Sequence, residues 1–380
     1  MRRLVRVVVG LVVAVAILLL AVRVLLGGGA RLEDRTTDPR IPATAIEQVA
    51  ALDYPPGNIA VSATGRVFLT LHPDGKPPIK VVELVDGKPV PFPDAAFQKP
   101  EAGSAHFQTP LSMRIDRQNR LWVLDHAEYG RGQPRILAFD IETRALVHQY
   151  DFPSEVAGFL SMLNDFAVSP DGTRVYIAES SPIKQTPALV VYDVEHRTSR
   201  RLLDRHPSVL PKHYVLNAAG RDMVVFGVYA LRIGVDSITL DRAGTWLYYA
   251  PVNGDRMFRV PTAALDDAAL APAALAAAVE DYGPKTMSDG LSSDDRGNVY
   301  VTDPEHSAIL TLGPDRMLTT LVKDATLRWP DGLSFGPDGW LYVTCSSLQH
   351  VLFVPSGHQA AYAPYHVFRF KPGATAAPGH

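Results

Sequence analysis

The stretch DGLSFGPDGWLYVT (Asp331–Thr344) decides the fold, because it contains an apolar strand, a tight turn and a second apolar strand. Five related stretches precede it: NIAVSATGRVFLTLH from Asn58, SMRIDRQNRLWVLDH from Ser112, NDFAVSPDGTRVYIAES from Asn164, DSITLDRAGTWLYYAP from Asp236 and DGLSSDDRGNVYVTDPEH from Asp289. Each predicts a β-hairpin, so the chain is built from one repeated unit.

The spacing of the repeats indicates the architecture. The turn positions are Gly65, Asn119, Gly172, Gly244, Gly297 and Gly339, which lie 54, 53, 72, 53 and 42 residues apart. Further strand-like runs follow the hairpins at residues 78–83, 136–140, 189–193, 257–260 and 309–312. These numbers match four-stranded blades and predict an all-β fold, a six-bladed β-propeller.

Two segments depart from the repeat. The long third interval indicates an insertion over roughly residues 181–230, which we interpret as a lid or a loop. An Ala-rich stretch at residues 263–280 is typical of a helix. We expect both to lie outside the repeated core.

The N-terminus is apolar and basic. Residues 7–22 carry no charge, and Arg2, Arg3 and Arg6 precede them. Twenty helical residues, 7–26, extend for about 30 Å, enough to cross a bilayer if Arg23 snorkels to the interface. We interpret residues 1–30 as a signal anchor or a signal peptide, 31–44 as a linker, 45–370 as the propeller and 371–380 as a flexible tail. Basic residues stay inside, so the propeller is expected to be extracytoplasmic, in the periplasm or at the cell surface, and either anchored in the membrane or secreted.

Composition narrows the function. Lys and Arg number 37 against 40 Asp and Glu, a net charge of −3, which gives no basic surface for nucleic acid. The single cysteine, Cys345, excludes an intramolecular disulfide. The sequence has no Gly-x-Ser-x-Gly, His-Glu-x-x-His, phosphate-loop or dinucleotide-binding motif. The expected partners are a small molecule and, through the N-terminal segment, a membrane; the oligomeric state stays open.

Several segments in their order resemble the major royal jelly protein/yellow family, whose bacterial members are labelled dopachrome-tautomerase-related. The matching segments are GRVFLTL from Gly65, LWVLD from Leu121, MLNDFAVSPDG from Met162, DSITLDRAGTWLYYAPVNGDRMFRVPTAAL from Asp236, KTMSDGLSSDDRGNVYVTDPEHSAI from Lys285 and LRWPDGLSFGPDGWLYVT from Leu327. The resemblance covers residues 45–370. It implies a six-bladed propeller, export, and binding or turnover of a small molecule at the channel mouth.

The first residue of each repeat is expected to face the channel axis. Counting eight residues back from each turn gives Gly57, Leu111, Asn164, Asp236, Asp289 and Asp331. An amide and three carboxylates are suitable ligands for Ca²⁺, so Asn164, Asp236, Asp289 and Asp331 form a candidate metal site. Alternatively, the Asp-Gly pairs only cap backbone amides at the strand entry. The repeat is also distantly similar to gluconolactonase and paraoxonase propellers, which hold axial calcium with a Glu near the first blade, where this chain has Gly57.

The second strand of each hairpin returns to the same rim and brings acids and histidines there. A histidine beside a carboxylate is suited to general acid/base catalysis. The catalytic candidates are therefore the pairs Asp125/His126 and Asp303/His306, together with His106 before the second repeat. Such residues equally cap loop amides, which is the structural alternative.

Three functions follow as hypotheses. The first is an isomerase-like (tautomerase) enzyme that uses the rim residues for proton transfer. The second is a Ca²⁺-dependent, lactonase-like hydrolase with calcium at the axial site. The third is a non-catalytic protein that binds an aromatic ligand at the channel mouth.

Overall fold

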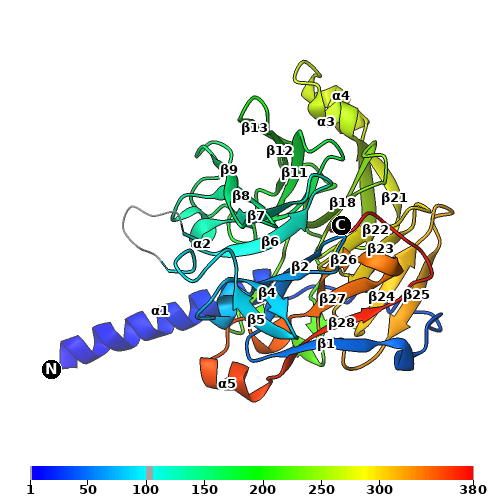
Figure 1. The fold of residues 1–380 in the computed structure, drawn as a ribbon. Coiled ribbons are helices and arrows are strands. Elements are labelled where there is room, and N and C mark those ends of the chain that lie inside the picture. The colour runs from blue at the N-terminus through cyan, green and yellow to red at the C-terminus, as the bar shows by residue number, and fades with distance from the viewer. Residues whose placement is uncertain (1, 100–105, 380) are drawn as a thin grey trace.

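The computed structural model describes residues 2–99 and 106–379, and its core is a six-bladed β-propeller (Figure 1). The inner strands of neighbouring blades contact one another in a closed ring around the channel. The fold that the repeats predict is therefore confirmed.

The first three blades follow the chain order, from the inner strand outward. Blade 1 contains β2 (Pro56–Val61), β3 (Val67–Leu71), β4 (Val81–Val85) and β5 (Lys88–Pro91). Blade 2 contains β6 (Pro110–Ile115), β7 (Arg120–Asp125), β8 (Arg135–Asp140) and β9 (Leu146–Asp151). Blade 3 contains β10 (Leu163–Val168), β11 (Arg174–Glu179), β12 (Ala188–Asp193) and β13 (Thr198–Leu202).

The last three blades complete the ring. Blade 4 contains β18 (Val235–Leu240), β19 (Trp246–Pro251), β20 (Arg256–Pro261) and β21 (Glu280–Pro284). Blade 5 contains β22 (Leu291–Ser293), β23 (Val299–Asp303), β24 (Ala308–Leu312) and β25 (Leu318–Lys323). Blade 6 contains β26 (Pro330–Phe335), β27 (Leu341–Cys345), β28 (Tyr365–Phe370) and, as its outer strand, β1 (Glu47–Leu52). The two ends of the domain thus close the ring by pairing in one sheet.

Local chemistry explains why the hairpins form. All six turn positions have positive φ, from 63° at Asn119 to 84° at Gly65, a conformation that glycine and asparagine tolerate best. The inner strands β2, β6 and β18 are buried along their whole length because blades pack on both of their faces. Large side chains such as Trp122, Phe166 and Tyr192 fill the space between blades.

The insertion is shorter than the sequence predicted. β12 and β13 lie within residues 181–230 and belong to blade 3, so only the segment after β13 leaves the repeat. That segment forms two small ribbons, β14 (Asn217–Ala218) with β15 (Arg221–Asp222), and β16 (Val224–Val225) with β17 (Tyr229–Ala230). The sequence did not identify β13 as a strand because Thr, Ser, Arg and Arg precede its one apolar residue, Leu202, so the strand shows no apolar alternation.

The helices are short apart from the first. The Ala-rich stretch forms α3 (Thr262–Asp266) and α4 (Pro272–Ala277) rather than one helix, because Pro272 starts a new helix and β21 begins at Glu280. The other helices are α2 (Ala127–Gly130) and α5 (Ser356–Ala361), with short 3₁₀ turns at Ala43–Ala45, Pro73–Gly75, Pro337–Gly339 and Leu348–His350.

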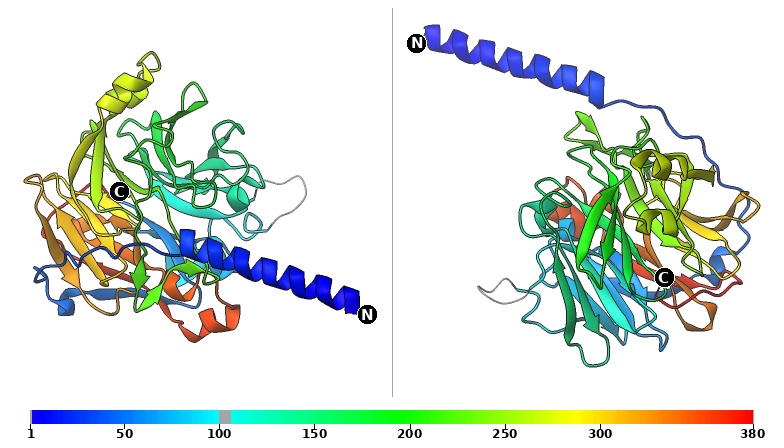
Figure 2. Two further views of the ribbon diagram at one scale, coloured as in Figure 1. Left: turned by 180° about the vertical axis from the view of Figure 1, so that it is seen from behind. Right: turned by 90° about the horizontal axis from the view of Figure 1, so that it is seen from above.

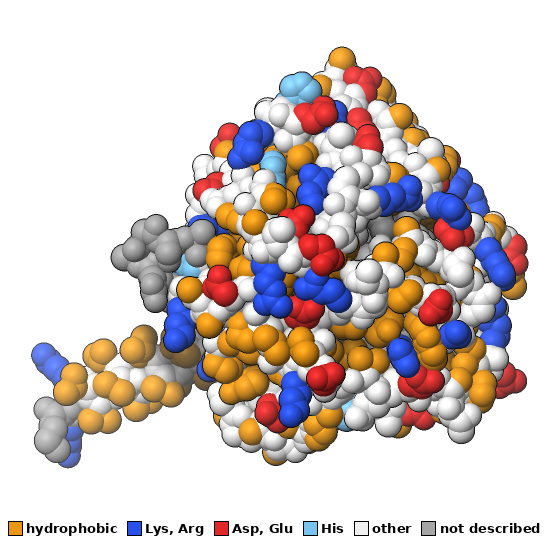
Figure 3. Space-filling model, in the orientation of Figure 1, with side chains coloured by type: hydrophobic (Ala, Val, Ile, Leu, Met, Phe, Trp, Pro, Cys, Tyr) orange, Lys and Arg blue, Asp and Glu red, His pale blue; other side chains and the backbone are white. Residues whose placement is uncertain are grey.

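The N-terminal helix α1 (Arg2–Leu26) projects from the propeller, and the chain after it crosses one face of the domain (Figure 2). Among the described residues it is the one helix long and apolar enough to span a membrane. Its side chains are apolar along most of its length, with arginines near the free end (Figure 3). The helix is therefore suited to be a signal or an anchor.

Both segments that flank the propeller are bonded to it. In the linker, the Thr37 and Arg40 backbone amides donate to Thr320. The C-terminal tail crosses the end of the channel where the hairpin turns lie: the Asp295 amide donates to the Thr375 carbonyl, and the Gly379 amide donates to the Phe335 carbonyl. The tail thus connects blades 5 and 6, although the sequence suggested a flexible segment.

Candidate functional site

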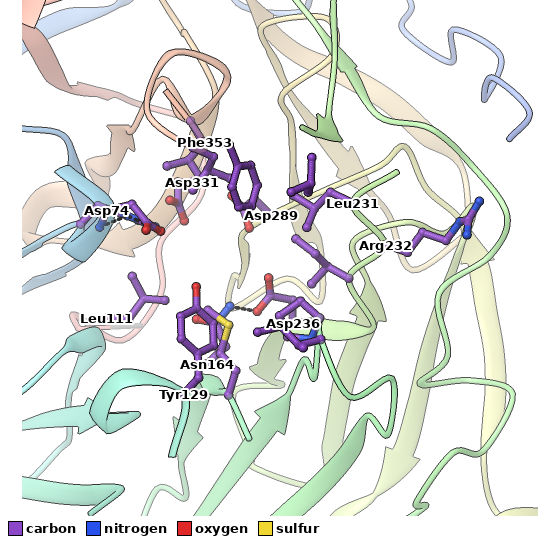
Figure 4. A pocket seen from close by; sticks show the side chains of 18 of the residues that line it. Asp74, Leu111, Tyr129, Asn164, Leu231, Arg232, Asp236, Asp289, Asp331 and Phe353 are labelled. Carbon is purple, nitrogen blue, oxygen red and sulfur yellow. Dashed lines mark hydrogen bonds and ion pairs between the residues drawn. The ribbon is translucent and has the colours of Figure 1, made fainter. Parts of the chain in front are cut away.

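A cavity of about 840 Å³ lies at the channel end where the inner strands begin. It is lined by all six residues found by counting back from the turns: Gly57, Leu111, Asn164, Asp236, Asp289 and Asp331. The remaining wall is largely apolar and includes Met162, Leu231, Ile233, Leu348 and Leu352. The strand starts make one end of the cavity acidic. The rest of the lining is largely apolar, with Asp74, His72, Gln185 and Arg232 as further polar residues, of which Figure 4 labels Asp74 and Arg232.

Irregular strand starts explain which residues reach the cavity. The pairing between inner and second strands shifts register near the first residues of β2, β6, β10, β18 and β26. A bulge lets consecutive residues face the same side. Accordingly, Asn58 lines the cavity beside Gly57, and Asp165 lines it beside Asn164. The sequence analysis missed these two residues because it assumed regular alternation.

Asp165 is a neutralised carboxylate. Its oxygens accept hydrogen bonds from Asn58 Nδ2 at 2.7 Å and from the Ser112 hydroxyl, and Arg114 Nη2 lies 3.4 Å away. Arg114 also donates to Asn58 Oδ1 at 2.5 Å. Burial raises the pKa of Asp165, while Arg114 opposes that shift. Asp165 therefore serves mainly to hold the start of β10 against blades 1 and 2.

The carboxyls of Asp236, Asp289 and Asp331 have no cationic partner within the part of the chain that the structure describes. Asn164 Nδ2 donates to Asp236, and Trp329 Nε1 donates to Asp289 Oδ2 at 2.5 Å. The Asp236 carboxyl lies within hydrogen-bonding reach of Asp289, and in Figure 4 the Arg232 guanidinium points away from both. No described cationic side chain is thus available to neutralise these three carboxyls when they ionise.

The pKa values of Asp236, Asp289 and Asp331 are all raised, because the three carboxyls are buried close together without a cation. Desolvation, followed by the nearby carboxylates Asp289 and Asp165, raises the pKa of Asp236 well above its ordinary value. Desolvation and the same neighbours raise the pKa of Asp331. Desolvation raises the pKa of Asp289 to about 6, although the Trp329 hydrogen bond lowers it. A bound positive charge would stabilise all three carboxylates.

The pair Asp125/His126 lies at the end of β7, outside the residues that line the cavity. Asp125 is fully buried and accepts hydrogen bonds from the backbone amides of Gln108, Thr109 and Ala127. His126 accepts from the Tyr129 amide, and burial lowers its pKa to about 3. Among the described residues its Nε2 has no hydrogen-bond partner. The observed contacts are those of loop capping, and the catalytic role stays a prediction.

The pair Asp303/His306 also lies outside the cavity lining. Asp303 accepts from the backbone amides of Glu305 and His306, and its Oδ2 lies 2.9 Å from His306 Nδ1. The other ring nitrogen of His306 lies 3.6 Å from Asp34 in the linker. The hydrogen bond to Asp303 raises the pKa of His306. His106 is half-buried before β6 and does not line the cavity.

His72 is the histidine that does line the cavity. It is buried at the end of β3, and its Nδ1 accepts from the Asp74 amide at 3.2 Å. Burial lowers its pKa, so the ring is neutral near pH 7. His72 is the last residue of the repeat that begins at Asn58, and the sequence analysis did not name it as a catalytic candidate because no acid precedes it there.

The donor set is chemically suitable for calcium, which prefers carboxylate and amide oxygens. However, within residues 2–99 and 106–379 no three His, Cys, Asp or Glu side chains are grouped closely enough to hold one metal ion. The side chains as placed therefore do not form a ready calcium site, and the metal assignment stays a prediction.

Comparison with known proteins agrees with the repeat. The family described as "Major royal jelly protein" matches residues 108–352, more than half of the chain. Major royal jelly protein 3 of Apis mellifera is 28% identical over 214 residues, which cover 52% of this chain and 37% of the bee protein. The matches span less than half the length of such curated relatives.

Solved structures share the fold at low sequence identity. A gluconolactonase from Xanthomonas campestris has a TM-score of 0.53 at 12% identity, covering 86% of this chain and 88% of that chain. A luciferin-regenerating enzyme has a TM-score of 0.54 at 13% identity, covering 88% and 97%. These similarities concern the propeller fold alone.

Proposed function

This chain belongs to the major royal jelly protein family, and from that premise we propose that it is an exported protein that binds a small amine with an apolar body at its channel mouth. The observation that carries the proposal is that the carboxyls of Asp236, Asp289 and Asp331 share one cavity with a largely apolar wall. An ammonium group would lie among Asp236, Asp289 and Asp331, and the apolar body would contact residues such as Leu111 and Leu231.

The energetics favour such a ligand over a neutral one. Hydrogen bonds to charged groups contribute about 1.5–3 kcal/mol each, and 1.4 kcal/mol corresponds to tenfold in affinity. Desolvation is the main cause of the raised carboxyl pKa values and repulsion between the carboxylates adds to it; a bound ammonium would offset that repulsion. A carboxylate ligand would add to that repulsion and should be excluded.

The test is a comparison of three matched ligands: phenethylamine, phenethyl alcohol and phenylacetate. Binding to the full chain in lipid nanodiscs is measured by calorimetry and by tryptophan fluorescence, to which Trp329, which contacts Asp289, contributes. We expect the amine to bind at least about tenfold more tightly than the alcohol. Equal affinity for all three, or preference for phenylacetate, would contradict the proposal.

Variants locate the binding site. Asp236→Asn and Asp331→Asn are each expected to weaken amine binding by about tenfold or more, because each removes a carboxyl that ionises against the bound ammonium. Glu195→Gln is the matched control, since Glu195 is exposed in the turn after β12. If the control and the cavity variants lose affinity alike, the amine binds elsewhere.

A second candidate function is isomerase-like proton transfer. It is favoured by carboxyls that face a largely apolar cavity, where they would be suited to exchange a proton with a bound substrate. Turnover of a dopachrome-like substrate that disappears in Asp236→Asn and in Asp331→Asn would support it. Turnover that depends on His126 or His306 instead would favour the rim pairs.

The calcium-dependent, lactonase-like alternative is tested by thermal unfolding of the same protein with calcium and with a chelator. A saturating cation at 100 times its Kd would stabilise the fold by about 2.7 kcal/mol. A calcium-dependent rise in melting temperature that Asp289→Asn abolishes, with lactone hydrolysis, would replace the amine proposal. If calcium does not change the melting temperature, an organic ligand remains the expected occupant of the cavity.

A further inference from the structure

The exposed aromatic side chains of the propeller gather at one end. Apart from α1, the described residues with large exposed apolar side chains include three phenylalanines, Phe159, Phe226 and Phe353, of which Phe226 is 83% exposed. All three lie in segments that follow strands returning to the channel mouth. Phe353 and Ile183 line the cavity, and Phe226 contacts Phe353 with ring centroids 6.0 Å apart.

These residues come from separate parts of the chain. Phe159 lies between β9 and β10, Ile183 between β11 and β12, Phe226 in the β16–β17 ribbon and Phe353 after β27. Leu26, the last residue of α1, also lines the cavity. We call Leu26, Phe159, Ile183, Phe226 and Phe353 the apolar rim.

The tether between helix and rim is short. The Ala30 amide donates to the His213 carbonyl, the Val215 amide donates to the Ala30 carbonyl, and Arg232 Nη2 donates to the Gly28 carbonyl at 2.5 Å. Only Gly27, Gly28 and Gly29 separate α1 from this attachment. Three residues extend by at most about 10 Å, so the end of α1 stays beside the channel mouth.

A lipid bilayer is the partner that fits both the apolar rim and its short connection to α1. If α1 spans the membrane, Leu26 lies near one interface, and the tether holds the rim at the same depth. Isolated apolar side chains are ordinary on a soluble surface, but aromatic residues clustered beside a spanning helix suit the interface. Lys184, exposed next to Ile183, would reach lipid phosphates.

From this arrangement we propose that the apolar rim inserts into the bilayer interface, so that the cavity opens onto the membrane rather than into bulk solvent. The rim then acts as a docking surface whose partner is lipid. Together with the proposed function, on which this consequence rests, it makes the ligand a membrane-partitioned amphiphilic amine. The docking itself needs no ligand, so it is tested separately.

The experiment places a fluorophore on one cysteine of the full chain in nanodiscs. Cys345 is 1% exposed and stays unlabelled in the folded protein. Phe226→Cys and Phe159→Cys report on two separate parts of the rim. Met317→Cys is the control, because Met317 is 63% exposed in the turn between β24 and β25, at the opposite end of the propeller. Quenching by lipids spin-labelled at the upper acyl chain is measured for each.

We expect several-fold stronger quenching at positions 226 and 159 than at position 317. Quenching at 226 alone would overturn the proposal, since it would report only proximity to α1. Equal, weak quenching at all three positions would also overturn it. In either case the amine-binding test above would still stand, because it does not depend on where the mouth faces.

Discussion

Asp289 links the acidic end of the cavity to the stability of the fold. Its pKa is about 6 in the folded protein, whereas an unfolded aspartate titrates near 3.9. Because the folded state binds the proton more tightly, its stability falls as pH rises from about 4 to about 6 and is then constant. The expected loss is about 3 kcal/mol.

Asp289→Asn removes this loss, since the amide stays neutral and still accepts a hydrogen bond from Trp329. We expect the variant to be more stable than the native chain at pH 8, by up to about 3 kcal/mol, and similar to it at pH 4. Urea unfolding at both pH values, with a chelator present, measures the difference. Glu195→Gln should change neither value; a destabilised Asp289→Asn at pH 8 would contradict the argument.

Gly290 shows why the repeats in blades 5 and 6 begin with Asp-Gly. A Cβ atom at Gly290 would collide with the Asp331 carbonyl of the next blade. Gly290→Ala is therefore expected to destabilise the fold by about 3 kcal/mol, since the blades must separate. At Gly357 in α5 a Cβ meets nothing within 4 Å, so Gly357→Ala should be neutral or slightly stabilising. Equal thermal stability of the two variants would refute this reading.

At the scale of elements, a threonine connects neighbouring blades at the irregular strand starts. Thr344 Oγ1 on β27 accepts from the Gly332 amide at 2.9 Å and donates to the Gly57 carbonyl at 2.6 Å. Thr70 on β3 makes the same two contacts, with the Asn58 amide and the Leu111 carbonyl. The hydroxyl satisfies the backbone amide that the bulge leaves unpaired.

Thr344→Val keeps the shape but leaves the Gly332 amide and the Gly57 carbonyl without this partner. Buried unsatisfied groups cost about 1–3 kcal/mol, so we expect the free energy of unfolding to fall by about 3 kcal/mol. Thr198→Val, on the exposed edge of β13, is the control and should change it by less than about 0.5 kcal/mol. Denaturant titration of both variants shows whether the loss of stability is specific to the hydroxyl of Thr344 or follows from any Thr→Val substitution in a strand.

The irregular starts of the inner strands explain which cavity residues could be predicted from the sequence and which could not. Alternation and turn glycines predicted the six hairpins, and the count from the turns located Asp236, Asp289 and Asp331, because these features repeat. Asn58 and Asp165 were missed because a bulge places two neighbouring residues on one face. Consecutive polar residues at a strand start, as in Asn164–Asp165, were the available signal.

The rim histidines illustrate a different limit. Asp125/His126 and Asp303/His306 have the composition of an acid/base pair, but the acids accept several backbone amides in the turns that follow β7 and β23. An aspartate close in sequence to a histidine occurs both in turns that cap backbone amides and in catalytic pairs. The two cases differ in where the pair lies relative to the cavity, and the local sequence does not contain that information.

At the scale of the whole molecule, the ring depends on joining its two ends. β1 pairs with β28 in blade 6, so residues from the two ends of the domain share one sheet. Without β1, the edge of β28 would expose unpaired backbone groups together with the apolar Val367 and Phe368. Closure is therefore a property of the chain as a whole and not of any single repeat.

Two truncated chains distinguish the contribution of the linker to stability from that of the closing strand β1. A chain that begins at residue 45 keeps β1 and is expected to unfold cooperatively as a monomer, because it loses only the helix and the bonds of the linker. A chain that begins at residue 53 lacks β1 and is expected to lose cooperative unfolding or to associate through the β28 edge. Calorimetry and light scattering compare them. If both chains stay monomeric with the same melting temperature, the five complete blades and three strands of blade 6 are enough, and closure by β1 is not what holds the ring.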